Sequence, residues 1–409
     1  MDVLHERCAG LDVHKDMVMA CMRWQHGGKP EREVRRFSTM TKGLLELSEW
    51  LSSHQCTHVA MEATGVYWKP VWHILEGSFE LVLANAAHIR NVPGRKTDVN
   101  DATWIADLLA HGLIRGSFVP PQPVQQMRDL TRTRKQLVRE VAQHVLRIQK
   151  TLEDANIKLD SVLSDVVGVS GRTILNALVE GKTDPSELAA LARTRVKASP
   201  EQLREALRGR VTDHHRFLLK LHLAQIDALH SAVREVEARM GEALEPFRDR
   251  VDLLLTIPGV KRTTAETIAA EIGFDMTRFR TAGHLVSWAG LCPRMDESAG
   301  KRRSTRTRPS TQWLKPMLVQ AAWAAGRKKN TYTQAQFQRL RARRGGKKAA
   351  VAVAASILTA AFHMLRDGTT YQDLGGNYFD KRDKAKIVKR LLRRLEDLDV
   401  HVAPVAAAT

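Results

Sequence analysis

The order of extended and amphipathic segments in the first 111 residues restricts the fold of this chain more than any other feature. Three short strands are predicted first, and alternating helices and strands follow. The predicted strands cover residues 7–12, 17–24, 33–37, 56–61 and 79–84, and the predicted helices cover residues 41–51, 65–75 and 98–111. The order βββαβαβα predicts an α/β fold, a mixed sheet with helices packed on its faces.

Four carboxylates stand at the ends of these segments. Asp12 ends the first strand, Glu62 ends the fourth, and Asp98 and Asp101 lie three residues apart on one helix face. Neighbouring strands can bring Asp12 and Glu62 together, and clustered like charges repel without a cation. Such oxygen ligands suit Mg²⁺ or Mn²⁺, which clamp the attacking and leaving oxygens of a phosphodiester. The alternative is that each is an ordinary surface or capping acid, with Asp98 as a helix N-cap.

The charge balance indicates a polyanionic partner. Lys and Arg number 64 and Asp and Glu 45, a net charge of +19, and residues 301–350 hold fifteen Lys or Arg and no acid. Such an excess predicts salt-dependent binding to nucleic acid through phosphate neutralisation. A basic ribosome-bound or membrane-surface protein is the alternative. The acid-free stretch favours a site, because a solvated surface normally mixes signs.

Residues 119–123, Val-Pro-Pro-Gln-Pro, mark a domain boundary. A long helix is predicted over residues 124–165, and a second over 213–247 with apolar residues near a/d spacing. We expect the second helix to pair with the first or with its copy in another protomer, which favours a homo-oligomer, a dimer or larger. Residues 166–212 read as a small inserted bundle.

Basic side chains follow one face of the first long helix. They are Arg128, Arg132, Lys135 and Arg139. Such a stripe is either a nucleic-acid-facing surface or a solvated coiled-coil face. Farther along, residues 253–273 resemble a helix-hairpin-helix, in which the turn at Gly259 and the cation at Lys261 bind phosphate without reading bases. A helix corner with no ligand is the alternative.

Residues 291–308 pass from an apolar segment into serine, glycine and cations, with Ser298 at the acidic-to-basic edge. There a hydroxyl could meet a DNA phosphate, so Ser298 is the candidate nucleophile. A turn serine before glycine is the alternative. The surrounding candidate phosphate contacts are Arg294, Lys301, Arg302, Arg303, Arg306 and Arg308, and beyond them Arg343, Arg344, Lys347 and Lys348. Trp313 and Trp323, in a predicted helix over residues 312–326, are core candidates or base-stacking aromatics.

Cysteine spacing and hydropathy limit the remaining classes. Cys8, Cys21, Cys56 and Cys292 are far apart and form no C-x-x-C pair, so neither a zinc module nor a disulfide framework is indicated. We expect a reduced, cytoplasmic, nucleoid-associated protein. No secretory signal is recognisable, and the apolar run over residues 349–365 predicts a buried helix rather than a membrane span.

Three N-terminal motifs together resemble those of the DEDD transposases of insertion-sequence family one hundred and ten. They are Gly10-Leu-Asp-Val-His-Lys15, Glu62-Ala-Thr-Gly65 and Lys96-Thr-Asp-Val-Asn-Asp-Ala102, in the family's order and at similar spacing. The resemblance implies a RuvC-like, ribonuclease-H-type domain in which Asp12, Glu62, Asp98 and Asp101 bind the metal.

The same family's C-terminal domain is matched by the hairpin motif, Ala289-Gly-Leu-Cys-Pro-Arg294 and Glu297-Ser-Ala-Gly300. Lys261 replaces a glycine of that hairpin. The resemblance implies that Ser298 is catalytic, in a composite site, and that a structured bridge RNA pairs with donor and target DNA.

The sequence therefore predicts a transposase or site-specific recombinase that exchanges strands by Mg²⁺-dependent serine chemistry. The predicted domains are residues 1–119, RuvC-like; 124–250, helical coiled coil with the bundle; 251–370, mainly α and carrying Ser298; and 371–409, a basic helical tail. One rival is a RuvC-like junction nuclease that uses water. The other is a non-catalytic nucleic-acid-binding protein.

Overall fold

The computed structural model describes residues 3–63, 65–86, 89, 92, 101–193, 196–293, 296–304, 306–307, 312–382 and 384–400. The chain divides into two compact units, Met1–Val119 and Pro120–Thr409. Asp98, Arg294 and Arg308 lie outside the described residues, as do the side chains of Ser298, Arg302 and Arg303.

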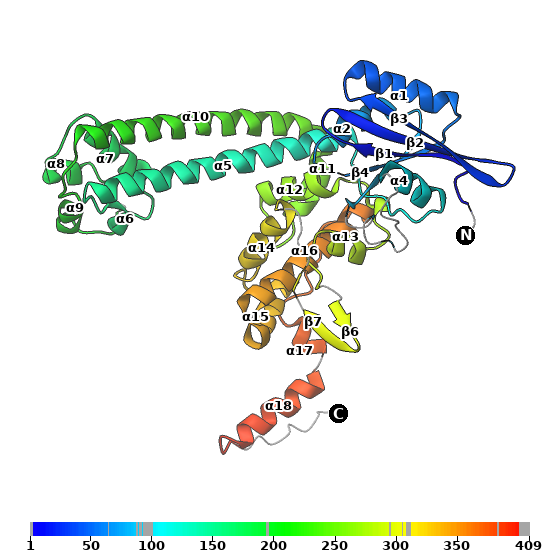
Figure 1. Ribbon diagram of the computed structural model, residues 1–409. Helices are drawn as coiled ribbons and strands as arrows, with labels where there is room; N and C mark the ends of the chain where they lie inside the picture. The colour runs from blue at the N-terminus through cyan, green and yellow to red at the C-terminus, as the bar shows by residue number, and fades with distance from the viewer. Residues whose placement is uncertain are drawn as a thin grey trace. The chain divides into compact units, whose positions relative to one another are not determined.

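The first unit is built on a five-stranded mixed sheet (Figure 1). Its elements are β1 (Arg7–Val13), β2 (Met17–His26), β3 (Lys29–Ser38), α1 (Thr41–Ser53), β4 (His58–Glu62), α2 (Trp68–Leu75), β5 (Glu80–Ala84) and α4 (Asp101–Ala110). The strand order is β3-β2-β1-β4-β5, with β1, β2 and β3 antiparallel and β1, β4 and β5 parallel. The predicted α/β order and mixed sheet are confirmed.

The two faces of this sheet bury different residues, because side chains alternate along a strand. On one face, Ala9, Leu11 and Val13 of β1 pack with buried residues of α1 and α2. On the other face, Cys8 of β1 and Ala60 of β4 pack with α4. The even-numbered residues of β1 and β4 therefore face α4.

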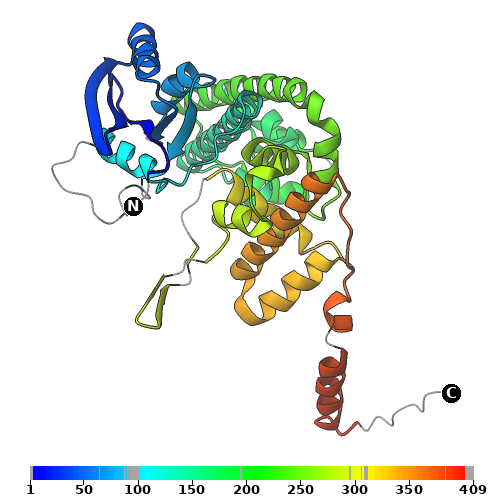
Figure 2. The same ribbon diagram turned by 90° about the vertical axis from the view of Figure 1, so that its right-hand side faces the viewer.

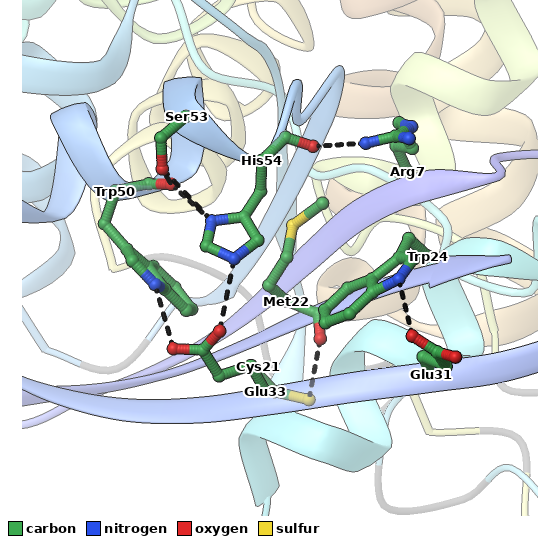
Figure 3. A network of polar contacts seen from close by, with 9 residues as sticks. All are labelled: Arg7, Cys21, Met22, Trp24, Glu31, Glu33, Trp50, Ser53 and His54. Atoms are coloured by element: carbon green, nitrogen blue, oxygen red, sulfur yellow. Dashed lines mark hydrogen bonds and ion pairs between the residues drawn. The ribbon is translucent and has the colours of Figure 1, made fainter. Parts of the chain in front are cut away.

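Polar contacts attach α1 to the strands beneath it (Figure 3). Glu33 of β3 accepts a hydrogen bond from Trp50 Nε1 at 3.2 Å, and its other oxygen lies 3.2 Å from His54 Nε2. Arg7 of β1 donates to the carbonyl oxygen of His54 at 2.8 Å. These contacts fix the carboxyl end of α1 on the sheet.

The second unit begins with two long helices, α5 (Gln122–Asp154) and α10 (Asp213–Leu244), which lie side by side (Figure 1). Between them in sequence come the short helices α6 (Leu159–Val162), α7 (Val169–Val179), α8 (Pro185–Ala190) and α9 (Pro200–Ala206). Their apolar residues share a core with Ile148 and Leu152 of α5 and Leu219 and Leu223 of α10. The predicted inserted bundle thus closes one end of the helix pair.

The rest of the second unit is mainly helical. Its elements are η1 (Glu245–Phe247), α11 (Arg248–Leu255), α12 (Arg262–Ile272), η2 (Met276–Arg278), α13 (Ala282–Trp288), β6 (Asp296–Ser298), β7 (Lys301–Ser304), α14 (Leu314–Ala325), α15 (Tyr332–Arg344), α16 (Gly346–Asp367), α17 (Tyr378–Arg382) and α18 (Lys384–Glu396). Among the described helices, α16 alone is long and apolar enough to span a membrane. It packs against α13, α14 and α15 as a largely buried helix.

The predicted limit of the first long helix is wrong. This helix ends at Asp154 instead of residue 165. Asn156 adopts φ 56°, a left-handed conformation that asparagine tolerates and that stops an α-helix. The predicted basic helical tail contains α17 and α18.

Candidate active site and nucleic-acid interface

Asp12 and Glu62 lie at the same level of the sheet on adjacent parallel strands. Leu11 of β1 is paired with Met61 of β4, so Asp12 and Glu62 are the next residues along each strand. Neighbouring strands are about 4.8 Å apart. Gly10 and Ala60, which face α4, come two residues before Asp12 and Glu62 in their strands. Because every second residue of a strand lies on the same face, both carboxylates point to the α4 side of the sheet.

Helix α4 brings Asp101 to this end of the sheet. A Cβ added to Gly10 would lie 2.2 Å from the carbonyl oxygen of Ala102, and Cys8 Sγ donates to the carbonyl oxygen of Ala106 at 3.6 Å. Cys8 thus lies beside Ala106 and Gly10 beside Ala102, so β1 and α4 run in opposite directions. The Asp12 end of β1 therefore lies toward Asp101, the first residue of α4. Asp12, Glu62 and Asp101 therefore lie toward the same end of the β1–α4 layer.

Asp107 holds α4 in this position. It accepts hydrogen bonds from Arg23 of β2 at 3.1 Å and from Arg32 of β3 at 2.8 Å. The Arg23 side chain is only 4% exposed, so its charge depends on Asp107 for compensation. The sequence did not predict that Asp107 binds these arginines. Asp107 is 84 positions from Arg23 and 75 positions from Arg32, and no local pattern relates residues so far apart.

His14 is a close polar neighbour of Asp12. Asp12 Oδ2 lies 3.0 Å from Nε2 of His14, and the Asp12 side chain is 24% exposed. Within the described ranges, no group of three or more His, Cys, Asp or Glu side chains is arranged to hold a metal ion, and Asp98 falls outside those ranges. Carboxylates that share one face and one end of the sheet nevertheless match the donor chemistry of a hard divalent cation.

Ser298 lies in a two-stranded hairpin that projects from the helices of the second unit (Figure 2). Ser298 is paired with Lys301, and the two residues between them form the turn. Ala299 and Gly300 have φ angles of 50° and 73°, the pattern of a type I′ hairpin turn. Ala299 pays a steric cost for this conformation, because its Cβ crowds the backbone.

Lys315 of α14 joins the two ends of the segment that carries the hairpin. Its Nζ donates to the carbonyl oxygen of Gly290 at 2.9 Å and to Thr307 Oγ1 at 2.6 Å. Pro293 and Thr307 also form a β-bridge below the hairpin. Burial lowers the pKa of Lys315. This lysine was not among the predicted residues, since its partners lie in irregular segments.

The basic stripe of α5 contacts the second unit's own helices. Arg132 makes two hydrogen bonds to the carboxylate of Glu271, at 2.9 and 3.0 Å, and the Glu271 side chain is 1% exposed. Arg128 donates to the carbonyl oxygens of Ala270 and Glu271, at 3.3 and 2.6 Å, and so caps the carboxyl end of α12. These contacts give the two arginines a structural role, and their binding to nucleic acid stays a prediction.

The other two cations of the stripe lie over an indole ring. Lys135 Nζ is 5.5 Å and the guanidinium carbon of Arg139 is 5.8 Å from the centre of the Trp313 ring, within cation–π range. Lys135 also donates to the carbonyl oxygen of Gln312 at 2.7 Å. Trp313 thus packs against cations of its own chain.

The turn at Gly259 packs closely on α14. Gly259 has φ 85°, and a Cβ there would lie 2.3 Å from the carbonyl oxygen of Ala321. Only glycine fits this position. Helix packing therefore explains why a glycine stands at position 259, as expected if this motif is a helix corner with no ligand. Lys261 is exposed just before α12.

The remaining predicted cations that the structure describes are exposed. They are Lys301 and Arg306 near the hairpin, and Arg343, Arg344, Lys347 and Lys348 around the junction of α15 and α16. At that junction Gly345 adopts φ 83° and separates the two helices. The cluster presents four positive charges to solvent, as a surface that contacts phosphate does.

Two family models match the chain. Residues 9–157 match a transposase model of the IS110 DEDD type, and residues 251–338 match the model described as transposase of the IS116/IS110/IS902 family. A 43.6 kDa protein of insertion element IS110 from Streptomyces coelicolor is 31% identical over 36% of each chain. A probable family 20 transposase from Pseudomonas aeruginosa is 25% identical over 77% of this chain and 85% of its own length. The two models fall on the sheet unit with α5 and on the helices around the Ser298 hairpin.

Proposed function

Because the chain belongs to the IS110 family of transposases, we propose that it cleaves and joins DNA to move the insertion sequence that encodes it. The observation that carries this proposal is that Asp12 and Glu62 lie on one face and at one end of adjacent parallel strands, with Asp101 toward the same end of α4. Carboxylates placed in this way suit phosphodiester chemistry. The charge of +19 suits a nucleic-acid substrate.

The first unit, in this proposal, is a RuvC-like domain of the ribonuclease-H type. Asp12, Glu62, Asp98 and Asp101 would hold Mg²⁺, with Mn²⁺ as a substitute. When bound, the metal supplies charge neutralisation at the attacking and leaving oxygens of the phosphodiester. Support comes from the mixed sheet and from the acid positions at the ends of β1 and β4.

Ser298 is the proposed nucleophile. Its Oγ bonds to phosphorus while the bond from phosphorus to the leaving oxygen breaks; the serine proton departs to a base, and the leaving oxygen takes up a proton. The phosphoserine retains the energy of the broken bond, so a DNA hydroxyl can later displace Ser298 and join strands without external energy. Support comes from the position of Ser298 beside a tight turn, at the edge of the acid-free basic segment that begins at Lys301.

The proposed partners are donor DNA, target DNA and a structured guide RNA. We propose that the protein acts in the cytoplasm at the nucleoid, as a dimer or larger homo-oligomer. The basic stripe, Lys261 of the proposed helix-hairpin-helix and the cluster around Gly345 are the proposed phosphate contacts. The RNA proposal predicts that changing the RNA loops redirects target choice, and unchanged targets would contradict it.

Metal-dependent cleavage tests the catalytic proposal. Purified chain is incubated with DNA that carries the element's ends, with its RNA, and with or without Mg²⁺. We expect cleavage by the wild type with Mg²⁺ and a loss of at least a hundredfold in Asp12→Asn and Glu62→Gln. Asp16→Asn, an exposed acid near the same strand, is the control and should cleave normally. Equal cleavage by all four proteins would contradict the proposed site.

A further inference from the structure

The second unit contains a cavity of about 560 Å³ lined by residues of α5, α10, α12 and α14. The lining residues come from four separate regions of the sequence. Those that matter here are Arg132, Arg134, Lys135, Arg139, Lys261, Thr263, Glu271 and Trp313.

The lining has a large excess of positive charge. It holds five cations, Arg132, Arg134, Lys135, Arg139 and Lys261, and one carboxylate, Glu271, so the difference is 5 − 1 = +4. Glu271 is already held by Arg132, and Arg134 pairs with Glu237 outside the cavity. Within the described part of the chain, Lys135, Arg139 and Lys261 form no salt bridge.

Lys135, Arg139 and Lys261 line the same cavity. Lys135 and Arg139 both lie over the Trp313 ring, at 5.5 and 5.8 Å from its centre. Burial lowers the pKa of Lys135 and the charge of Arg139 lowers it further, while the Glu271 carboxylate partly offsets both effects. Like charges on one cavity wall repel, and a bound anion would offset that repulsion. The first turn of α12, whose end of the helix dipole is positive, opens on the same cavity.

The lining also limits what kind of anion fits. Arg132, Lys135 and Arg139 all lie within cation–π range of the Trp313 ring, at 5.4, 5.5 and 5.8 Å from its centre, so cations contact this ring where a stacked base would otherwise lie. Thr263 adds a hydroxyl donor, as phosphate oxygens require. A cavity of this volume accepts a nucleotide-sized group rather than a duplex.

We propose that this cavity binds a backbone phosphate of a nucleic-acid strand, through Lys135, Arg139 and Lys261. The inference rests on the proposed function only in taking a nucleic acid as the partner. It adds a defined site at which the strand is held, lined by residues other than those of the Ser298 hairpin and the cluster around Gly345.

The test is the salt dependence of binding by the full chain to a single-stranded and to a duplex oligonucleotide. Arg139→Gln with Lys261→Gln is compared with wild type and with Arg234→Gln plus Lys220→Gln, which removes the same charge from exposed positions on α10. Each lost phosphate contact lowers the slope of log K against log salt by roughly 0.7 to 0.9. We therefore expect the cavity variant to lose roughly 1.4 to 1.8 from the slope with at least one of the oligonucleotides.

The control pair should keep the wild-type slope, and Arg139→Lys, which retains the charge, should keep most of it. Equal slopes for the cavity variant and the control pair would overturn the inference. So would a wild-type protein that binds neither oligonucleotide. If the cavity variant has a lower slope but the wild type does not cleave DNA, the phosphate site is supported and the proposed reaction is rejected. If the wild type cleaves DNA but the cavity variant keeps the wild-type slope, the proposed reaction is supported and the phosphate site is rejected.

Discussion

Gly10 and Ala102 are in direct backbone contact: a Cβ at Gly10 would come within 2.2 Å of the Ala102 carbonyl oxygen. This contact seats α4 on β1 and sets where Asp101 lies relative to Asp12. A side chain at position 10 would have to displace α4, because the atoms that its Cβ would meet, the carbonyl oxygen of Ala102 and the amide nitrogen of Ala106, belong to the helix backbone.

Gly10→Ala should therefore lower stability and activity together. Overpacking of a tight core site costs about 1–3 kcal/mol or more, so we expect a lower thermal midpoint of the full chain and weaker metal-dependent cleavage. Gly116→Ala is the matched control in the same unit, because its Cβ would meet only Val82 at 3.7 Å. A Gly10→Ala protein as stable as Gly116→Ala would show that α4 is not seated in this way.

Glu271 is expected to be the most sensitive acid of the second unit. Glu271→Gln leaves Arg128 and Arg132 without their carboxylate in a site where the glutamate is 1% exposed. Breaking a buried ion pair costs about 3–5 kcal/mol. Glu242→Gln, which breaks an exposed pair with Arg239, should change stability by less than about 1 kcal/mol. Thermal unfolding of the two variants compares them, and equal midpoints would contradict the buried pair.

Lys315 is expected to position the Ser298 hairpin. Lys315→Met removes both hydrogen bonds that join Gly290 to Thr307, so amide hydrogen exchange over residues 296–304 should become faster. The covalent protein–DNA product should fall about tenfold, with substrate affinity less affected. Thr307→Val removes one of the two bonds and should have a smaller effect in the same direction. Lys347→Met is the control for the loss of one positive charge. If amide exchange over residues 296–304 is as fast in Lys347→Met as in Lys315→Met, the positioning role of Lys315 is rejected.

Cysteine reactivity tests the packing of the first unit. Burial raises the pKa of the Cys8 and Cys56 thiols to about 12 and also raises that of Cys21. The thiolate is the form that reacts, so at pH 8 these three thiols should be nearly inert to iodoacetamide. Cys292 is the partly exposed cysteine. Mass spectrometry should find one rapid modification in the native chain and four in urea, and rapid labelling of Cys8 or Cys56 would contradict the fold.

Local patterns were sufficient to predict the sheet and the positions of its acids. Alternating apolar residues define β1 and β2, and the parallel pairing of β1 with β4 follows from the helix between them. What places Asp101 toward the Asp12 end of β1, however, is the close approach at Gly10. A glycine in a strand does not reveal which backbone will lie against it.

The function of the α5 stripe shows a second limit of the sequence. A run of basic residues at helical spacing defines a face, but it does not reveal what covers that face. Here Glu271, 139 residues from Arg132, and Trp313 cover much of it. An acid inside the apolar run 268–272 was a signal that a cationic partner would be needed.

The most direct test of the central claim is a denaturing gel for covalent protein–DNA adducts, from cells that carry the gene with its flanking DNA. The wild type should give an adduct, and Ser298→Ala and Asp12→Ala should each abolish it while the protein remains at normal levels. This result would join the serine to the carboxylate site in one reaction. Free cleaved ends that persist in Ser298→Ala, with no adduct in the wild type, would contradict the account and assign the attack to water.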